Sequence, residues 1–403
     1  MGIEMTDLED VKGIAGVAGK PRFSGEWVKL GDICNVRSGG TPKRSVSEYW
    51  DKGTIPWVKI GDISGKYIST TEESISEAGL NSSAAKLFQP GTLLFSIFAS
   101  IGAVGILTVP AATNQAIAGL EITSKIIDRD YLFYFLKSSE MNAKQSGRGV
   151  AQNNINLSIL RDMKVPAPSL AEQSAIAREF ERIDCQIDAA NNQLSSLDSL
   201  VKSRFIEMFG DCRLARQDQG WKRIGDIGEV LGGATPKTQV EEYWEGEFPW
   251  ITPAEIGDAI YVKTAKRTLT AEGVQSCSLS KLPAGTVLLS SRAPIGKVAI
   301  AGTDMYCNQG FKNIVCGDSV LPRYLYSLLK FNSDYLNSLG RGATFKEISK
   351  RIVEDIKIPV PAVELQLEFE CFAQKVDKLR FDVQQQIDKL ELLKSSLMQE
   401  YFG

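Results

Sequence analysis

The five residues GGTPK at positions 39–43 return as GATPK at positions 233–237. Glycines followed by Thr-Pro-Lys predict a tight turn near the domain surface, from which a basic side chain extends. The turn is not a phosphate-binding P-loop, because Pro236 stands where that motif needs its second glycine, and proline has no N–H to offer a phosphate. Because the turn occurs twice, the sequence around the two copies decides what it serves.

The two turns belong to a tandem duplication that covers nearly the whole chain. WVKLGDI at 27–33 matches WKRIGDI at 221–227, and EYW recurs at 48–50 and 242–244. Further along, DMKVPAP matches DIKIPVP, and EMFG at 207–210 matches the final EYFG. We therefore expect two copies of one fold, related by a pseudo-two-fold axis.

Composition limits the classes of function. The chain has 403 residues, 43% of them hydrophobic, which suits two or three globular domains. Its formal net charge of −3 argues against non-specific electrostatic binding of nucleic acid but allows a local basic patch. With no histidine, a Ser-His-Asp triad or an HExxH zinc site is impossible. Its 7 cysteines are scattered without a C-x-x-C pair, which predicts reduced thiols in a cytoplasmic protein.

An uncharged stretch at 92–120 is long enough to suggest a membrane span. Its counterpart in the second copy carries Arg292, Lys297 and Asp304, and two copies of one element cannot be a bilayer span and a charged surface hairpin. Both stretches are therefore predicted to be short strands broken by Gly and Pro turns, with no membrane contact.

Each copy divides into two parts of different amino-acid composition. The first is rich in Gly, Thr, Val, Ile and aromatic residues with regularly spaced turn signals, which predicts a strand-rich mixed domain. The second has no Gly or Pro between its opening and its end, which predicts one long helix. The expected class is α+β, in the order flexible leader 1–21, domain 22–165, helix 166–210, domain 211–358 and helix 359–403.

Both helices carry a heptad seam, in which apolar residues alternate at steps of four and three as in a coiled coil. A capping box of Ser169 and Glu172 predicts the start of the first helix. The seam residues are Ile176, Phe180, Ile183, Ile187, Leu194 and Leu197 in the first helix, and Val376, Val383, Ile387 and Leu390 in the second. The economical arrangement pairs the helices antiparallel within one chain. The alternative is that each helix packs only on its own domain.

The predicted seams also include charged positions. Arg204 in the first helix and Arg380 and Lys394 in the second stand among the apolar residues, so neither helix is an ideal dimer zipper. Towards the helix ends, the seams are expected to continue through Met208 and Tyr401.

The ordered set of motifs resembles the specificity subunits of type I restriction-modification enzymes. The motifs are GGTPK, EYW and IPWVKIGDI, then SRAPIGKVAIAG and NQGF, then the P-x-P and EQ that open each helix, and the resemblance covers the chain from about Pro21. It implies that each globular part is a target recognition domain reading one half of a bipartite, asymmetric double-stranded DNA site. It also implies that the helices set the gap and dock two DNA adenine methyltransferase subunits, with restriction and translocase subunits as further partners.

The same resemblance implies a non-catalytic chain without a cofactor of its own, with S-adenosylmethionine, ATP and Mg²⁺ on the partner subunits. The sequence agrees, since it shows neither an N/D-P-P-Y/F methyltransferase motif nor a glycine-rich cofactor loop. DMK at 162–164 and DIK at 355–357 resemble the end of a metal-nuclease motif, but each simply leads a strand into the Pro pair before a helix. A two-headed coiled-coil interaction scaffold and a carboxylate nuclease remain the rival interpretations.

Candidate DNA-binding residues are the basic and amide side chains of the repeated motifs, together with the threonines of the two TPK turns. They are Arg37, Thr41, Lys43, Arg44, Lys59, Asn114, Gln115 and Arg148 in the first copy, and Thr235, Lys237, Arg292, Lys297, Asn308, Gln309, Arg341 and Lys346 in the second. Base edges are read by donors and acceptors, whereas phosphate contacts fix position.

Positions that differ between the copies are the expected readers of different half-sites. Arg292 stands against Phe98 and can take guanine O6 and N7, worth ~1 to 3 kcal/mol of discrimination, or hold a phosphate. The Asn-Gln pair is retained in both copies, so it serves either a shared backbone contact or an internal turn hydrogen bond. The arginine of each GRG is expected to clamp a phosphate. The TPK turns have a purely structural alternative, as turns between strands.

Overall fold

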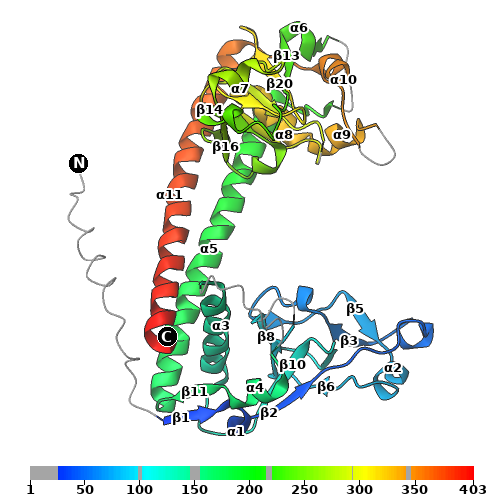
Figure 1. Cartoon of the computed structure of the whole chain (residues 1–403), viewed down its shortest axis with the longest axis vertical. Helices are drawn as coiled ribbons and strands as arrows, with labels where there is room; N and C mark the ends of the chain where they lie inside the picture. The colour runs from blue at the N-terminus through cyan, green and yellow to red at the C-terminus, as the bar shows by residue number, and fades with distance from the viewer. Residues whose placement is uncertain (1–25, 99–101, 146–154, 215–219, 293, 342–345) are drawn as a thin grey trace, which may run out of the picture. The chain divides into compact units, whose positions relative to one another are not determined.

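The computed structural model describes residues 26–98, 102–145, 155–214, 220–292, 294–341 and 346–403, without the side chains of 140–145. The chain divides into two compact units, Met1–Ala190 with Gln386–Gly403 (unit 1) and Asn191–Gln385 (unit 2). Each unit therefore contains one strand-rich part and portions of both long helices (Figure 1).

Unit 1 is built on two mixed sheets. The first has the order β2-β10-β7-β8-β4, and the second has the order β5-β3-β9-β6. Their strands are β2 (Cys34–Ser38), β3 (Ile55–Val58), β4 (Tyr67–Ile68), β5 (Glu73–Ile75), β6 (Leu87–Phe88), β7 (Leu93–Ser96), β8 (Val104–Leu107), β9 (Ala111–Thr113) and β10 (Ile117–Ile122). Helix α3 (Arg129–Gln145) packs on β7 and β8, and short helices α1 (Leu30–Ile33) and α2 (Glu77–Asn81) lie in the connections.

Unit 2 repeats this arrangement with one strand fewer. Its sheets have the orders β13-β20-β17-β18-β15 and β16-β14-β19, and a single bridge between Leu282 and Met305 replaces the fourth strand of the second sheet. The strands are β13 (Gly228–Gly232), β14 (Trp244–Ile251), β15 (Tyr261–Val262), β16 (Arg267–Leu269), β17 (Val287–Leu289), β18 (Val298–Ala301), β19 (Tyr306–Cys307) and β20 (Lys312–Cys316). The helices are α6 (Ile224–Ile227), α7 (Ala271–Gln275), α8 (Pro322–Phe331) and α9 (Ser333–Ser338). The predicted tandem repeat and α+β class are confirmed.

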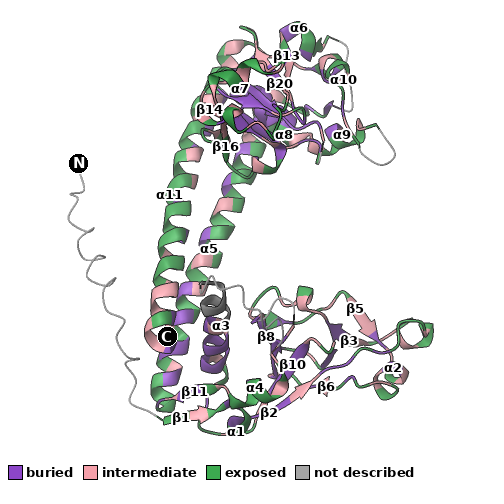
Figure 2. Ribbon diagram, viewed as in Figure 1, coloured by how far each residue is buried: buried purple, intermediate pink, exposed green. Residues whose placement is uncertain are grey.

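The uncharged stretch at 92–120 forms the central strands β7 to β10, as the comparison of the two copies predicted. Side chains of β7, β8 and β9 are buried throughout, which explains why the stretch lacks charge. Figure 2 shows the same burial in the central strands of both units. Among the described residues, no helix combines the length and apolar character that crossing a membrane requires.

A short antiparallel ribbon closes each strand-rich part just before its long helix. β1 (Glu26–Lys29) pairs with β11 (Lys164–Ala167), and β12 (Lys222–Arg223) pairs with β21 (Lys357–Ile358). Helices α4 (Leu157–Asp162) and α10 (Lys350–Asp355) directly precede the second strand of each ribbon.

The aspartates of DMK and DIK have structural partners in these ribbons. Asp162 pairs with Lys29 at 2.8 Å, and Asp355 pairs with Arg223 at 2.5 Å. The described residues contain no group of three or more potential ligands that could hold a metal ion. The two motifs therefore close the ribbon in each unit, which leaves the nuclease interpretation without support from their geometry.

Each long helix begins where a buried glutamine ties it to the strand-rich part. The helices are α5 (Leu170–Phe209) and α11 (Val363–Phe402). In unit 1, the Gln173 amide donates to the carbonyls of Ile126 and Pro168 at 2.8 Å and accepts from the Asp128 N–H. Gln366 makes the same three bonds in unit 2, with Ser319, Pro361 and Leu321. A fully buried amide with these partners fixes how the helix leaves the sheet.

The predicted capping box is present at the start of α5. The Ser169 N–H donates to the Glu172 carboxylate at 2.9 Å, and the Glu172 N–H donates back to Ser169 Oγ at 3.3 Å. These hydrogen bonds satisfy donors that the first turn of a helix leaves free.

The long helices pack antiparallel in each unit, as predicted. In unit 1, Lys394 pairs with Asp184, and the Tyr401 hydroxyl donates to Glu179 at 2.9 Å. In unit 2, Arg204 pairs with Glu368 at 2.8 Å, and Arg380 pairs with Asp198. Residue numbers rise along one helix as those of its partner fall. The three charged seam positions thus face acidic side chains of the other helix.

All ten predicted seam residues are at least partly buried. Towards the helix ends, however, the buried stripe departs from the prediction. Phe205, not Arg204, follows Val201 in the core of unit 2, and Met398 and Phe402 are buried in unit 1, whereas Tyr401 is only partly buried. An α-helix drifts away from a strict seven-residue repeat, so the C-terminal end of each long helix turns towards the strand-rich part of the unit in which that end lies. Helix pairing and packing on the domain therefore both occur.

We predict that Phe205→Ala destabilises unit 2 by about 3 to 5 kcal/mol, because the ring packs against Phe209, Tyr324, Phe331 and Phe369 and its loss leaves a cavity. The matched control is Leu200→Ala on the same helix, where the side chain is 47% exposed and the cost should stay below about 0.5 kcal/mol. Urea unfolding of both variants measures the difference. Equal midpoints would contradict the assigned core.

Candidate nucleic-acid interface

The structure brings the TPK turn and the Asn-Gln turn together in both units. In unit 1, the Thr41 hydroxyl donates to the Gln115 amide oxygen, and in unit 2 Thr235 donates to Gln309 at 2.5 Å. The backbone joins them as well, since Gly40 N–H donates to Thr113 in unit 1 and Ala234 N–H donates to Cys307 in unit 2. Two motifs that are far apart in sequence therefore form one surface.

The first glycine of each TPK turn is required by this close approach. A Cβ on Gly39 would lie 2.0 Å from Thr113 Oγ1, and one on Gly233 would lie 2.1 Å from the Cys307 carbonyl oxygen. Real Cβ atoms essentially never come so near, so only glycine lets the turn sit against the neighbouring strand. The turns therefore have a structural role in the fold that does not depend on a ligand.

A pair of tryptophans supports each TPK turn from inside the unit. Trp57 Nε1 donates to the Gly40 carbonyl at 3.1 Å, and Trp50 Nε1 donates to the Lys43 carbonyl at 3.3 Å. In unit 2, Trp250 and Trp244 make the same bonds to the carbonyls of Ala234 and Lys237. The backbone of the turn is therefore held while the lysine side chain stays exposed.

Asn114 and Asn308 serve their own turns. Asn114 Oδ1 accepts from the Ala116 N–H at 3.0 Å, and Asn308 Oδ1 accepts from the Gly310 N–H at 2.9 Å. The internal turn hydrogen bond that the sequence left open for these residues is present in both copies. A shared DNA-backbone contact by this Asn-Gln pair stays a prediction.

The hairpin after β7 or β17 lies beside the Asn-Gln turn. In unit 1, the Ile97 N–H donates to the Ala116 carbonyl, and the Ile155 N–H donates to the Ile97 carbonyl. In unit 2, Ser291 and Gly310 make the first bond, and Ile348 and Ser291 make the second. We call the resulting surface the loop row: the TPK turn, the Asn-Gln turn, the described residues of the β7–β8 or β17–β18 hairpin, and the described residues just before α4 or α10.

Several predicted DNA-binding cations already have partners inside their unit. Arg37 pairs with Glu121 at 2.7 Å, and Arg44 pairs with Glu73 at 2.6 Å. Lys59 pairs with Glu72 at 2.6 Å and with Glu73 at 3.0 Å, and these two carboxylates raise the pKa of Lys59. The hydrogen bond from Arg44 is the main cause of a lowered pKa at Glu73.

Lys297 is also occupied inside its unit. Its ammonium donates to the carbonyl oxygens of Ile256 at 2.9 Å and Pro253 at 3.4 Å. Lys297 thus braces the connection that follows β14. Lys297 stands where the first copy has Ala103, so this difference between the copies has a structural use.

Five predicted cations have no side-chain hydrogen bond or ion pair with another described residue: Lys43, Lys237, Arg292, Arg341 and Lys346. Arg292 is half-buried in the hairpin and the other four are exposed. Lys43 and Lys237 extend from the TPK turns, and Arg341 and Lys346 flank the segment that enters α10. Arg148 lies outside the described residues. Among the described residues, the loop row of unit 1 thus carries one such cation, Lys43, and that of unit 2 carries four.

Two basic residues near the loop row were not predicted from the sequence. Lys312 on β20 donates to Ser291 Oγ and pairs with Glu347, both at 3.3 Å, which joins the hairpin to the segment before α10. Arg267 on β16 lies over the ring of Trp244. Their counterparts in the first copy are Ala118 and Glu73, so a search for basic residues shared by both copies passes over them.

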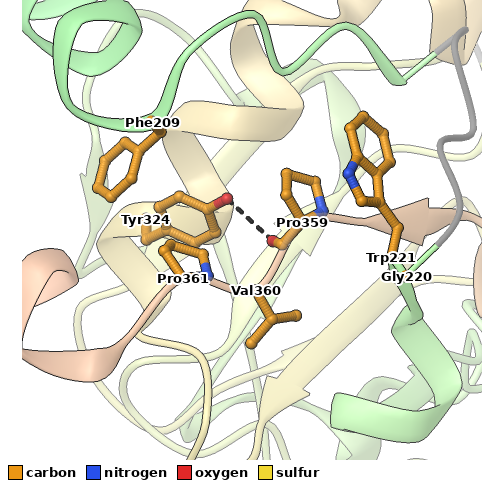
Figure 3. Close-up of a pocket in the computed structure, with 7 residues that line it drawn as sticks. All are labelled: Phe209, Gly220, Trp221, Tyr324, Pro359, Val360 and Pro361. Atoms are coloured by element: carbon orange, nitrogen blue, oxygen red, sulfur yellow. Dashed lines mark hydrogen bonds between the residues drawn. The ribbon is translucent and has the colours of Figure 1, made fainter.

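The pocket beside the closing ribbon of unit 2 holds no catalytic group. Figure 3 shows a pocket of 310 Å³ in unit 2, lined by Phe209, Gly220, Trp221, Tyr324, Pro359, Val360 and Pro361. Tyr324 is its only ionisable side chain. The hydroxyl donates to the Pro359 carbonyl at 2.9 Å, and burial raises the pKa of Tyr324, so it remains a neutral donor. This pocket is a packing seam between the closing ribbon and the long helix.

Comparison with protein families accounts for the duplicated arrangement. The model of the type I restriction modification DNA specificity domain matches the chain twice, over residues 25–198 and 218–392. The chain belongs to this family. Each match covers one strand-rich part and most of the long helix that follows, so the family unit coincides with the repeat found in the sequence.

Curated relatives bear related names. The specificity subunit of the type I restriction enzyme MjaIX from Methanocaldococcus jannaschii is 39% identical over 209 residues, which is 50% of this chain and 48% of that protein. The EcoR124I/EcoR124II specificity subunit from Escherichia coli is 28% identical over 54% of this chain and 56% of its own length. The chain thus matches about half the length of these two relatives. A putative MjaX specificity subunit from M. jannaschii is 26% identical over 92% of this chain and 91% of that protein.

Solved structures share the fold. A chain of a type I R-M system, studied for complex assembly and conformational transition, has a TM-score of 0.57 and 17% identity over 95% of this chain and 99% of its own. The type I restriction-modification S subunit from M. genitalium has a TM-score of 0.52 and 15% identity over 95% and 97% of the two chains. At these identities the likeness concerns the fold.

We predict that Gly233→Ala destabilises unit 2 by about 1 to 3 kcal/mol, because the new methyl group forces the turn away from the Cys307 carbonyl. The matched control is its neighbour Gly232→Ala, where an added Cβ meets nothing within 4 Å and the change should stay within about 0.5 kcal/mol. Thermal unfolding of the two variants tests this. The assigned turn contact is wrong if Gly232→Ala proves the more damaging substitution.

Proposed function

We propose that this chain is the DNA-specificity subunit of a type I restriction-modification complex, in which each unit reads one half of a bipartite, asymmetric target. The observation that carries the proposal is the double match to the DNA specificity domain, one match for each copy of the loop row. The names of the curated relatives support the same role.

The side chains of the two loop rows support an asymmetric target. Their backbone frames share the hydrogen bonds described above, but the cations differ: Arg292 in unit 2 stands where unit 1 has Phe98, and Arg44 in unit 1 stands where unit 2 has Thr238. An arginine that reaches a base edge offers donors that match guanine, whereas a phenylalanine offers only apolar contact. Two similar frames with different side chains are suited to two different half-sites.

Methyl transfer and cleavage belong, in this proposal, to partner subunits. The partners are double-stranded DNA, two DNA adenine methyltransferase subunits that dock on the long helices, and a restriction and translocase subunit. S-adenosylmethionine, ATP and Mg²⁺ would be bound by those partners, and the chain itself would be cytoplasmic and non-catalytic. An interaction scaffold without DNA specificity is the competing function.

The deciding experiment is a domain exchange read out as methylated bases. Replacing residues 22–165 by the corresponding domain of a relative, in cells that carry the methyltransferase partner, should change one half of the methylated motif and leave the other half intact. The unexchanged chain with its partner gives the reference motif, and the chain without its partner should give no methylation. A motif altered in both halves, or no motif in the reference cells, contradicts the proposal.

We further propose that the long helices set the gap between the half-sites. The support is the buried heptad seam and the antiparallel packing within each unit. A helix whose seam repeats every heptad can be lengthened by one heptad without losing phase, which gives about 10 Å at ~1.5 Å per residue.

We predict that one heptad inserted after Ala190 and one after Val383 lengthens the unspecified gap by roughly three base pairs, at ~3.4 Å per base pair. Three base pairs also rotate the second half-site by roughly 100°, so loss of methylation is the other result expected if the helices set the gap. The methylated motif in cells is the measurement, and an insertion after Ala190 alone, which shifts the helix pairing, is the control and should be worse. Full methylation of the original motif with its original gap would show that the helices do not set the gap between the half-sites.

A further inference from the structure

Arg267 occupies an unusual position beside the TPK turn of unit 2. Its guanidinium carbon lies 3.3 Å from the centroid of the Trp244 ring and 5.9 Å from that of Trp250. The two indoles meet edge to face at 5.1 Å, and their N–H groups hold the carbonyls of Lys237 and Ala234. The arginine is therefore stacked on the same two rings that support the turn.

Unit 1 has a guanidinium at the same place, but it comes from another part of the chain. Arg44, which follows the TPK turn, lies 3.7 Å from the Trp50 ring and 5.0 Å from the Trp57 ring. In the cross-strand register, Trp57 faces Glu73 on β5, and Trp250 faces Arg267 on β16. The first copy thus has a glutamate where the second has its arginine.

The charge around the two guanidinium groups differs. In unit 1, Glu73 accepts from Arg44 at 2.6 Å and from Lys59 at 3.0 Å, so two cations share its carboxylate. In unit 2, Thr252 takes the place of Lys59 and caps its turn with Glu255. Arg267 has no hydrogen bond or ion pair with another described residue, although Glu245 and Glu247 lie on the adjacent strand.

Stacking leaves the donors of a guanidinium available. A ring face covers one side of the plane, whereas the N–H groups point outward within the plane, where they can form a fork to an anion. The exposed Arg267 is thus held in position by Trp244 while its donors remain unused among the described residues. In unit 1, the corresponding donors of Arg44 are occupied by a carboxylate.

We propose that Arg267 binds a backbone phosphate of the DNA half-site read by unit 2, and that Glu73 takes the place of that phosphate on Arg44 in unit 1. This inference rests on the proposed function, because the adjacent TPK turn must face DNA. It adds a contact on which the two units differ: unit 2 gains one phosphate contact at its tryptophan pair, and unit 1 neutralises the same position internally.

The test measures DNA affinity of the chain assembled with its methyltransferase partner, on a duplex carrying its methylated motif, over a range of salt concentrations. Arg267→Leu keeps an apolar cover on Trp244 but removes the donors. Arg267→Leu should weaken binding to the same motif by about tenfold. It should also make the slope of log K against log salt shallower by about 0.9, as expected for one lost phosphate contact. Arg267→Lys should retain most of the slope.

Lys281→Leu is the matched control, because it removes one positive charge from the same unit but from a side chain paired with Asp304 at 2.7 Å. Its effect on the slope should be much smaller. Glu73→Gln provides an independent arm in unit 1, since it frees the Arg44 donors and should make binding tighter and its salt slope steeper. This arm keeps the test valid even if Arg267→Leu lowers stability.

The outcomes separate the two levels of inference. If the wild-type complex shows no preference for the motif, the proposed function fails, and this inference fails with it. If the wild type binds its motif but Arg267→Leu leaves affinity and slope unchanged, the phosphate contact alone is wrong. A changed motif in Arg267→Leu would overturn the phosphate assignment in favour of a base contact, and an unchanged slope in Glu73→Gln would overturn the role given to Glu73.

Discussion

The aromatic cluster at which the two long helices meet in each unit is the contact on which the rest of the structure depends. In unit 2, Phe205 near the end of α5 packs on Phe369 near the start of α11 and on Tyr324 of α8. In unit 1, Phe180 of α5 stacks on Tyr134 of α3 and on Phe402 at the end of α11. One cluster thus joins both long helices to the helix that covers the sheet. Because that sheet carries the loop row, the cluster also determines where the loop row sits within its unit.

The duplication separates the parts of the surface that are fixed from those that vary. Backbone hydrogen bonds, the close-packed glycines and the indole N–H groups hold the loop row in the same way in both units. Charged side chains on this frame differ, and several are neutralised within their unit, as Glu73 neutralises Arg44 and Lys59. A chain with a net charge of −3 can therefore present basic side chains locally while other cations, such as Arg44 and Lys59, are paired with neighbouring carboxylates.

The sequence was sufficient for features that depend on local pattern. Strands at 92–120, the capping box at Ser169 and the ten seam residues follow from composition, spacing and comparison of the two copies, and the structure confirms them. It was not sufficient for side chains whose partners arrive through tertiary pairing. Lys59 meets Glu72 and Glu73 because β3 pairs with β5, and no local pattern gives that register.

Arg267 is a second residue whose partners could not be predicted from the local sequence. In the alignment of the two copies it stands opposite a glutamate, so a search for repeated basic residues does not find it. Only the register with Trp250 and the stacking on Trp244 show that it takes the place of Arg44. The exact site residues therefore remain predictions, although the frame that carries them is defined.

The division between frame and side chains has a consequence for how such a surface changes. Lys43, Lys237, Arg341 and Lys346 are exposed and make no side-chain bond to another described residue, so replacing them costs little folding free energy. Replacing Gly39 or Gly233 forces a strand and a turn apart, since the added carbon would lie within 2.0 to 2.1 Å of the neighbouring strand. Surface chemistry can therefore be altered at the cations without disturbing the fold, whereas the glycines and tryptophans must be kept for any choice of cations. A repeated frame that tolerates different side chains is what allows one chain to hold two unlike surfaces.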